Sequence, residues 1–326
     1  MKLLDWRRLP ASAVAPLYDR ESIRWRAALA WDTAPSWEVV ESARTTWGLP
    51  GLACVDRSRR IRGWTFFVVR EDHVSVGLVS AESARVTELL ARGILRRAGH
   101  ATRLEGFVRA DAPGLAETLD RLGVAYTRYA YQARVTASTG PGDASVPAGG
   151  SALEPFQVSA WNVDAADETA GLLRACYGTA GRTFARDNSP GSWRDYVREL
   201  AEHPGCGLLS PALSRQVRAD GRLRAVTLVT SLAPDTAHIA QLAVDPALRR
   251  CGLARYLVAD ALRAARAAGY ARLSLLVSEE NTAALDLYRR FGFEECGAFF
   301  ALHGARARRH EGVRHAPAVS TLTRGA

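Results

Sequence analysis

One basic, glycine-containing stretch has the residue types of an anion-binding loop. An apolar strand is expected to end at Val244, a turn follows at Asp245-Pro246, and an alanine-rich helix begins after Gly252. The first N–H groups of a helix have no partner within the helix, so they can bind an anion at its start. Gly252 lets the backbone approach a phosphate closely. Arg249 and Arg250 add positive charge there, so the stretch predicts a phosphate site.

A second segment with chemical potential runs from Asn281 to Phe293. The spacing of its apolar residues predicts a helix that starts near Asn281 and carries Tyr288. A tyrosine hydroxyl held near sulfur can protonate a leaving thiolate. The structural alternative is that Asn281 only caps the helix and Tyr288 is a half-buried aromatic residue.

Both segments resemble motifs of the GNAT superfamily of N-acetyltransferases. The first matches Arg/Gln-x-x-Gly-x-Gly/Ala through Arg249, Gly252 and Ala254. The second matches Asn-x-x-Ala-x-x-Leu-Tyr-x-x-x-Gly-Phe from Asn281 to Phe293. The resemblance implies that the loop holds the pyrophosphate of acetyl-CoA.

In this family the strand before the loop splays from the next strand, and its free backbone pairs with the pantetheine arm. Asn281 would contact the same arm, and Tyr288 would be the general acid. The residues expected to bind the cofactor are Leu242, Ala243, Val244, Arg249, Arg250, Cys251, Gly252, Leu253, Ala254, Asn281 and Tyr288.

The candidate general base is His238, which precedes the loop at a spacing similar to that of the catalytic histidine in arylalkylamine acetyltransferases. A histidine is largely neutral at pH 7 and can accept a proton. The alternatives are Glu279, Glu280 and a water relay, and His238 could instead make a structural hydrogen bond. Leu276 occupies the place where many family members carry a glutamate.

Composition favours an ordinary globular protein of about two domains. The chain has 326 residues, of which 48% are hydrophobic and 24% charged. It contains no apolar run as long as a membrane span. The first residues, Met1 to Arg8, contain no apolar signal-peptide core, so a cytoplasmic location without membrane partners is expected.

The formal charge of +9 comes almost entirely from arginines that are spread along the chain. A positive field attracts a polyanion such as CoA. No DNA- or RNA-binding motif accompanies the arginines, so no nucleic-acid partner is expected. The five cysteines are scattered and form no Cys-x-x-Cys pair, which predicts neither a disulfide framework nor a metal site.

A segment rich in Gly, Pro, Ser and Ala divides the chain near its middle. It predicts a domain over residues 1–137, a linker over 138–152 and a second domain over 153–326. The order of expected elements in the second half matches the GNAT order, with final strands around Glu295–Leu302 and near Val319–Thr323. The expected fold is α/β of the α+β mixed-sheet type. It comprises two tandem GNAT-like domains, each a mostly antiparallel sheet splayed around a cofactor helix.

The two halves also resemble each other. Arg103–Val124 aligns with Arg272–Phe293 without a gap, as strand, turn, helix and Gly-apolar pair. Upstream, pairing His73 with His238 leaves the first half four residues shorter across the loop. Its counterpart there, Ser80–Val86, has no glycine, and Glu82 is expected to face the phosphate position. The first half therefore reads as a degenerate copy without a cofactor loop.

Together these features predict an acetyl-CoA-dependent N-acetyltransferase that acetylates a primary amine, on a small molecule or a protein, by direct attack in a ternary complex. Acceptor selection is expected in the Tyr177–Ser189 loop, the Ser192–His203 helix and the Gly304–His315 loop. Arg182 and Arg186 would suit an acidic or phosphorylated acceptor, and the alternative is that they are solvated loop arginines. One alternative is an acyltransferase similar to mycothiol synthase that acts on an amino-sugar conjugate. The other is a non-catalytic, CoA-binding regulatory protein.

Overall fold

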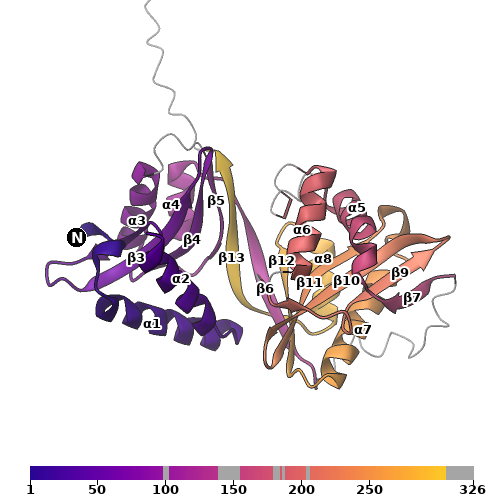
Figure 1. The fold of residues 1–326 in the computed structure, drawn as a ribbon. Helices are drawn as coiled ribbons and strands as arrows, with labels where there is room; N and C mark the ends of the chain where they lie inside the picture. The colour runs from indigo at the N-terminus through magenta and orange to yellow at the C-terminus, as the bar shows by residue number, and fades with distance from the viewer. Residues whose placement is uncertain (98–102, 139–154, 179–183, 186–187, 203–205, 306–326) are drawn as a thin grey trace, which may run out of the picture.

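The fold is a single twisted sheet that runs through two lobes, and in each lobe helices cover both faces of the sheet (Figure 1). The computed structural model describes residues 1–97, 103–138, 155–178, 184–185, 188–202 and 206–305. Most of the predicted linker 138–152, the strand predicted near Val319–Thr323 and Arg182 and Arg186 lie outside these residues. The domain boundaries therefore stay a prediction.

The N-terminal half begins with a short strand and two helices, and further strands and helices follow along the chain. Its elements are β1 (Lys2–Asp5), a 3-10 turn (Trp6–Arg8), α1 (Ala11–Leu29), α2 (Ala34–Thr46), β2 (Gly51–Val55), β3 (Ile61–Val69), β4 (His73–Ala81), α3 (Ala84–Arg97), β5 (Arg103–Arg109), α4 (Leu115–Leu122) and β6 (Tyr126–Val135).

The C-terminal half repeats this order. Its elements are β7 (Gln157–Ala160), a 3-10 turn (Val163–Ala165), α5 (Ala166–Tyr177), α6 (Pro190–Glu202), β8 (Leu208–Leu209), β9 (Arg215–Ala219), β10 (Arg222–Ala233), β11 (Thr236–Val244), a 3-10 turn (Pro246–Leu248), α7 (Leu253–Ala267), β12 (Arg272–Ser278), α8 (Thr282–Arg290) and β13 (Glu294–Ala305).

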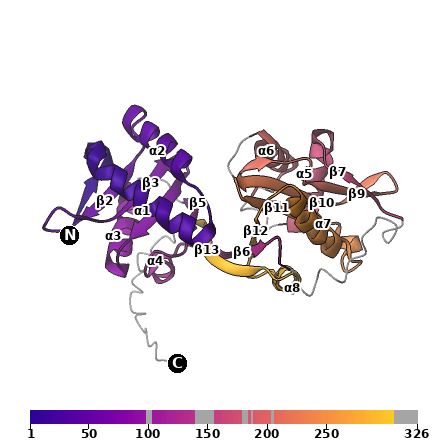
Figure 2. The same cartoon turned by 90° about the horizontal axis from the view of Figure 1, so that it is seen from below.

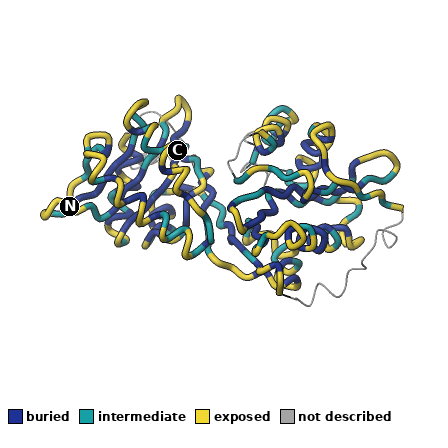
Figure 3. The backbone as a smooth tube through the Cα atoms, turned by 60° about the horizontal axis from the view of Figure 1, so that its bottom comes forward, coloured by how far each residue is buried: buried dark blue, intermediate teal, exposed yellow. Residues whose placement is uncertain are grey.

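Each half buries hydrophobic clusters on both faces of its strands. In the N-terminal half, α1 and α2 cover one face through residues such as Leu17 and Trp37, and α3 and α4 cover the other. In the C-terminal half, α5 and α6 cover one face, and α7 and α8 cover the other. The burial pattern follows this layering, with buried strands between helices whose outer sides are exposed (Figure 3).

The two halves exchange a strand where they meet. The strand order is β1-β2-β3-β4-β5-β13-β6-β12-β11-β10-β9-β7, so β13 pairs with β5 of the first half and β6 pairs with β12 of the second. Phe299 lies opposite Arg109, and Tyr131 lies opposite Leu276. Figures 1 and 2 show β6 and β13 running side by side between the lobes. Each half therefore completes its sheet with a strand of the other.

The exchanged strands share a core that draws on both halves. Phe299 of β13 is 2% exposed, and its ring centroid lies 5.7 Å from that of Trp25 in α1 and 5.0 Å from that of Phe107 in β5. The centroid of Tyr131 in β6 lies 6.4 Å away. Because this core joins α1, β5, β6 and β13, the two halves are expected to unfold together.

Phe299→Ala tests this coupling. Removing a fully buried ring should lower the free energy of unfolding by about 3–5 kcal/mol. The loss should appear as one shifted transition in thermal unfolding, observed by circular dichroism and by tryptophan fluorescence. Phe107→Ala is the control, because Phe107 stacks on the same ring but is 38% exposed and should cost less. Two separate transitions, with only one shifted, would contradict the coupling.

Candidate active site

The central strands of the C-terminal half part from each other at a defined point. The parallel pairing of β11 with β12 runs from Thr236 opposite Arg272 to Ile239 opposite Leu275, although β11 continues to Val244 and β12 to Ser278. On the other side of β11, the register with β10 shifts at the same place and leaves Ala240 as an extra residue. Such a bulge bends a strand and increases its twist. The bulge therefore accounts for the V-shaped opening that the sequence resemblance implied.

The candidate phosphate loop lies at the end of the splayed part of β11. Asp245 turns the chain by accepting a hydrogen bond from Ala247 N at 3.0 Å, and it pairs with Arg224 at 2.7 Å. Arg250 and Gly252 then take left-handed backbone angles, with φ of 69° and 86°. These angles bring the chain directly into α7 at Leu253.

The start of α7 presents free amides and open space. The first helical hydrogen bond runs from Tyr256 N to Gly252 O at 2.9 Å, so the N–H groups of Leu253, Ala254 and Arg255 precede it. A side chain placed on Gly252 would meet nothing within 4 Å. An anion at this position would have room and backbone donors.

Positive charge at the loop is not neutralised by a carboxylate among the residues that the structure describes. Arg249 and Arg250 are exposed, and Arg249 Nη2 donates to the carbonyl of Cys176 at 3.3 Å. Cys251 is exposed between the loop arginines and Gly252. The two guanidinium groups therefore remain available to an anion at the helix start.

Tyr288 lies on α8 within the core that α7 and α8 share. It is 6% exposed and packs edge-on against Phe293, with ring centroids 5.7 Å apart. Burial raises its pKa well above the usual range, with no contribution from a hydrogen bond. Burial raises the pKa of Tyr177, at the end of α5, and the nearby Tyr288 hydroxyl raises that pKa further. The Tyr288 hydroxyl therefore stays protonated at neutral pH, as a proton donor must.

Asn281 caps α8. Its side-chain oxygen accepts a hydrogen bond from Ala284 N at 3.2 Å, which is the structural role weighed for it. Its amide group remains at the exposed start of the helix, beyond the end of β12. Capping accounts for its presence, and a contact with the CoA arm stays a prediction.

His238 lies in the paired part of β11, on the side of the bulge away from the phosphate loop. It is 3% exposed, and its ring stacks on that of Tyr131 with centroids 6.2 Å apart. Its Nδ1 lies 2.9 Å from Ser274 Oγ, and that hydroxyl donates to Ala237 O at 3.2 Å. The ring therefore donates from Nδ1 and leaves Nε2 free to accept. Burial lowers the pKa of His238 from 6.5 to about 4.

Neither glutamate named as an alternative base is buried. Glu279 forms an ion pair with Arg128 of β6, and Glu280 is exposed at the turn before α8. Both lie just beyond the splayed end of β12. They are placed to pass a proton to solvent, and choosing the base among these groups stays a prediction.

In the N-terminal half the parallel strands part in the same way, but the connection that follows them is shorter. Its parallel pairing ends at Val76 opposite Gly106, and Gly77 is the bulged residue. These positions correspond to Ile239, Leu275 and Ala240. His73 therefore corresponds to Thr236, and its alignment with His238 was wrong by two residues. The two identical residues misled the alignment because strand pairing, not residue identity, sets the register.

With the corrected alignment, the first half has no counterpart of the phosphate loop. Only Glu82 and Ser83 separate β4 from α3, whereas Asp245–Gly252 separates β11 from α7. The first half is thus six residues shorter here, not four. Glu82 does not face a phosphate position, because it pairs with Arg62 at 3.0 Å and its N–H donates to Arg62 O at 2.9 Å.

Polar side chains bridge the splayed ends in the first half. Ser80 of β4 donates to the buried Glu21 of α1 at 2.5 Å. Arg24 of α1 pairs with Glu21 at 2.9 Å and with Asp111, just after β5, at 2.8 Å. Arg109, at the end of β5, pairs with the same Asp111 at 2.5 Å. This network links the separated ends of β4 and β5, between which the extended part of a substrate would have to lie.

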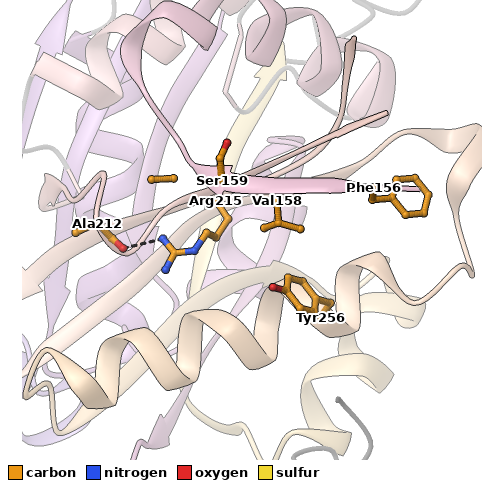
Figure 4. A pocket seen from close by; sticks show the side chains of 7 residues that line it. Phe156, Val158, Ser159, Ala212, Arg215 and Tyr256 are labelled. Carbon is orange, nitrogen blue, oxygen red and sulfur yellow. Dashed lines mark hydrogen bonds between the residues drawn. The ribbon is translucent and has the colours of Figure 1, made fainter. Parts of the chain in front are cut away.

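A depression of about 630 Å³ lies elsewhere, between the β7 edge of the sheet and α7 (Figure 4). Arg215 points into it beside Tyr256, but its guanidinium group is already paired with a carboxylate. Its Nε lies 2.8 Å from Asp260 Oδ2, and its Nη1 donates to the carbonyls of Ala212 and Ser214 at 2.7 and 2.9 Å. Since β9 and β10 lie between β7 and β11, this depression is separate from the splay.

Two further features concern only the described part of the chain. No group of three or more His, Cys, Asp or Glu side chains gathers there as a metal site. No described helix combines the length and apolar character that crossing a membrane would need.

Comparison with protein families identifies the half that carries the splay and the loop. Residues 173–293 match the family described as Acetyltransferase (GNAT) family. This segment is a GNAT acetyltransferase domain. It runs from α5 through the phosphate loop to the end of the Asn281–Phe293 motif, so both motifs found in the sequence lie inside it. No curated protein matches the chain in sequence.

Solved structures extend the likeness to nearly the whole chain. A GCN5-related N-acetyltransferase from Sphaerobacter thermophilus is 16% identical with a TM-score of 0.62, and the match covers 93% of this chain and 95% of that one. A tandem GNAT protein from the clavulanic acid biosynthesis pathway is 16% identical with a TM-score of 0.58, covering 94% and 98%. A fungal glucosamine N-acetyltransferase region is 14% identical with a TM-score of 0.59, covering 93% and 38%. At these identities the likeness shows the fold, which is that of tandem GNAT proteins.

One group beside the splay was not singled out from the sequence. Gln241 of β11 is 2% exposed; Tyr177 Oη donates to its Oε1 at 2.8 Å, and its Nε2 donates to Tyr196 Oη at 2.5 Å. Acceptor selection was predicted for the Tyr177–Ser189 loop, the Ser192–His203 helix and the Gly304–His315 loop. Tyr177 and Tyr196 belong to the first two of these segments, and most of the third lies outside the described residues. The only available signal was the high aromatic content of those segments.

The lowered pKa of His238 predicts a pH dependence of stability. Between about pH 6.5 and 4 the unfolded chain binds a proton that the folded protein excludes, so the free energy of unfolding falls as the pH drops. The loss due to His238 should reach about 2–3 kcal/mol between pH 7 and pH 4.5. His238→Asn, which keeps a donor toward Ser274, should weaken this dependence in urea unfolding. No difference in slope is expected between pH 7 and 8.5, and equal slopes at acid pH would contradict the prediction.

Proposed function

We propose that the C-terminal half transfers the acetyl group of acetyl-CoA to a primary amine by direct attack in a ternary complex, and that the N-terminal half has no donor site of its own. The observation that carries this proposal is the parting of β11 and β12 at Ile239 and Leu275, directly before a glycine-containing helix start. The N-terminal half has the same splay without the loop, which supports a single donor site.

The residues fit an acetyl-CoA molecule in three places. The free amides at the start of α7, together with Arg249 and Arg250, would hold the pyrophosphate in the open space above Gly252. The edge of β11 from Leu242 to Val244, which has lost β12 as a neighbour, would pair with the amide groups of the pantetheine arm. Asn281 would contact that arm from the start of α8.

The transfer needs one bond formed, one bond broken and three proton movements. The ammonium group loses one proton before the attack, the sulfur gains one, and the attacking nitrogen loses a second proton as the amide forms, which replaces the proton that Tyr288 gives up. The amine nitrogen forms a bond to the thioester carbonyl carbon, and the carbon–sulfur bond breaks. Tyr288 supplies the proton to the departing sulfur, since its pKa keeps it protonated until then. The proton of the ammonium group leaves to His238, Glu279, Glu280 or water. The lowered pKa of His238 keeps its ring neutral but makes it a weaker base, and its buried position implies an intervening water.

Gly252→Glu tests the donor site. The added carboxylate would occupy the space for the phosphate and repel it, so the affinity for CoA should fall about 100-fold or more in calorimetric titration. Gly269→Glu is a matched control, because Gly269 has the same φ of 86° and the same open surroundings but lies at the far end of α7. It should bind CoA like the wild type. Equal affinities for all three proteins would refute the site.

Tyr288→Phe tests the proton donor. The substitution keeps the buried ring and removes only the hydroxyl, so kcat for release of CoA thiol should fall about 10- to 100-fold while the Kd for CoA stays unchanged. Tyr256→Phe on α7 controls for loss of a tyrosine hydroxyl in the same domain. An unchanged kcat in Tyr288→Phe would remove its role. Tight CoA binding with no turnover of any amine by the wild type would instead favour a regulatory protein.

A further inference from the structure

The exchanged strand β6 carries side chains of the N-terminal half to the splay of the C-terminal half. Tyr129 lies opposite Ser278 and Ala130 opposite Val277, in the part of β12 that has parted from β11. β6 is therefore the next strand along from the opening. The side chains of β6 at this point therefore form part of the C-terminal site, although they belong to the other half of the chain.

Tyr129 meets a group of aromatic rings that faces the opening from α5 and α6. Phe184 lies at the centre of this group, which we call the aromatic box. Its ring centroid is 6.4 Å from that of Tyr129, 5.3 Å from Tyr177, 5.6 Å from Tyr196 and 6.5 Å from Trp193. Tyr129 is 7% exposed, whereas Phe184 is half-buried. The box is thus closed by a ring from the N-terminal half.

The box adjoins the position of the candidate acid. Burial raises the pKa of Tyr177 well above its usual range, and the nearby hydroxyls of Tyr288, Tyr196 and Tyr129 raise that pKa further. Tyr177 also contacts Gln241 on the splayed part of β11. The box therefore borders both arms of the opening, on the face of α5 and α6 and opposite that of α7. An acceptor that reaches the acyl carbon from this face has to pass along these rings.

Among the residues that the structure describes, the box presents aromatic rings and no charged side chain. Tyr177 and Tyr196 both hydrogen-bond Gln241, which uses its oxygen for Tyr177 and its nitrogen for Tyr196. A sugar acceptor would need several free donors and acceptors, and an acidic acceptor would need a cation. Ring faces instead attract an ammonium group and bury a flat apolar body.

We propose that Tyr129 of the N-terminal half closes the acceptor side of the C-terminal site, and that this side takes a primary amine carried on an apolar, aromatic body. The inference rests on the proposed acetyl transfer for its reaction, but its binding part is independent of turnover. Tyr129 is a specificity-determining residue in this scheme, since it touches the acceptor and not the reacting sulfur.

The test uses 2-phenylethylamine as probe, with L-glutamate and D-glucosamine as comparison acceptors, and follows CoA thiol release by the full-length protein. The kcat/KM for phenylethylamine should exceed those for the other two by about tenfold or more. Tyr129→Leu should raise the KM for phenylethylamine about tenfold and leave the KM for acetyl-CoA unchanged. Tyr126→Leu is the matched control, because Tyr126 lies on the same strand but packs against Phe300 in the N-terminal core, at 4.5 Å between centroids.

Phe184→Leu provides a second variant should Tyr129→Leu fail to fold, and it should raise the same KM. A preference for glutamate or glucosamine would overturn the proposal. So would an equal effect of the Tyr129 and Tyr126 variants, or a parallel rise in the KM for acetyl-CoA.

Calorimetric binding of phenylethylamine to the protein–CoA complex separates the two proposals. Binding that is weakened by Tyr129→Leu and kept by Tyr126→Leu, without turnover of any amine, would uphold the acceptor site and reject the transferase function. Turnover of other amines without detectable phenylethylamine binding would uphold the transferase and overturn the acceptor site.

Discussion

The geometry of the C-terminal half depends on where β11 and β12 separate. The two strands form four parallel residue pairs and then part. The extra residue Ala240 makes it impossible for β11 to follow both neighbours, and it stays with β10. A buried backbone group left without a partner is costly, so the separated edges need other partners. On the far side β12 is satisfied by β6 along its full length. The near edge of β11 is left for a substrate with amide groups of its own.

The N-terminal half shows that the splay alone does not make a donor site. It has the same bulge, at Gly77, and the same four parallel pairs. What differs is the connection that follows. With two residues between β4 and α3, the N–H of Glu82 is already bound to Arg62 O, and the helix starts against the strand end without an open turn. The Glu21–Arg24–Asp111 network then links the separated arms. The donor site that we propose thus depends on six residues of loop more than on the sheet.

The sequence was sufficient for features that depend on neighbours in the chain. The turn at Asp245, the helix start after Gly252 and the cap at Asn281 each follow from a few adjacent residues, and the structure has them where they were expected. Features that depend on distant pairing were not predictable. The alignment of His73 with His238 rested on residue identity, whereas the register is fixed by hydrogen bonds to β5 and β12. Strand exchange leaves no local trace, because β6 and β13 have the same pattern whichever half they pair with.

The strand exchange gives the N-terminal half a structural role that does not require it to bind a cofactor or catalyse a reaction. Without β6, the edge of β12 from Arg272 to Ser278 would be unpaired, and exposed strand edges invite association with other chains. Without β5, β13 would lose the partner that holds Phe299 against Trp25. The first half can therefore lose its phosphate loop while its fold stays necessary. Because Tyr129 and Tyr131 both come from β6, this half contributes to the proposed acceptor wall and to the surroundings of His238 through the same strand that completes the sheet.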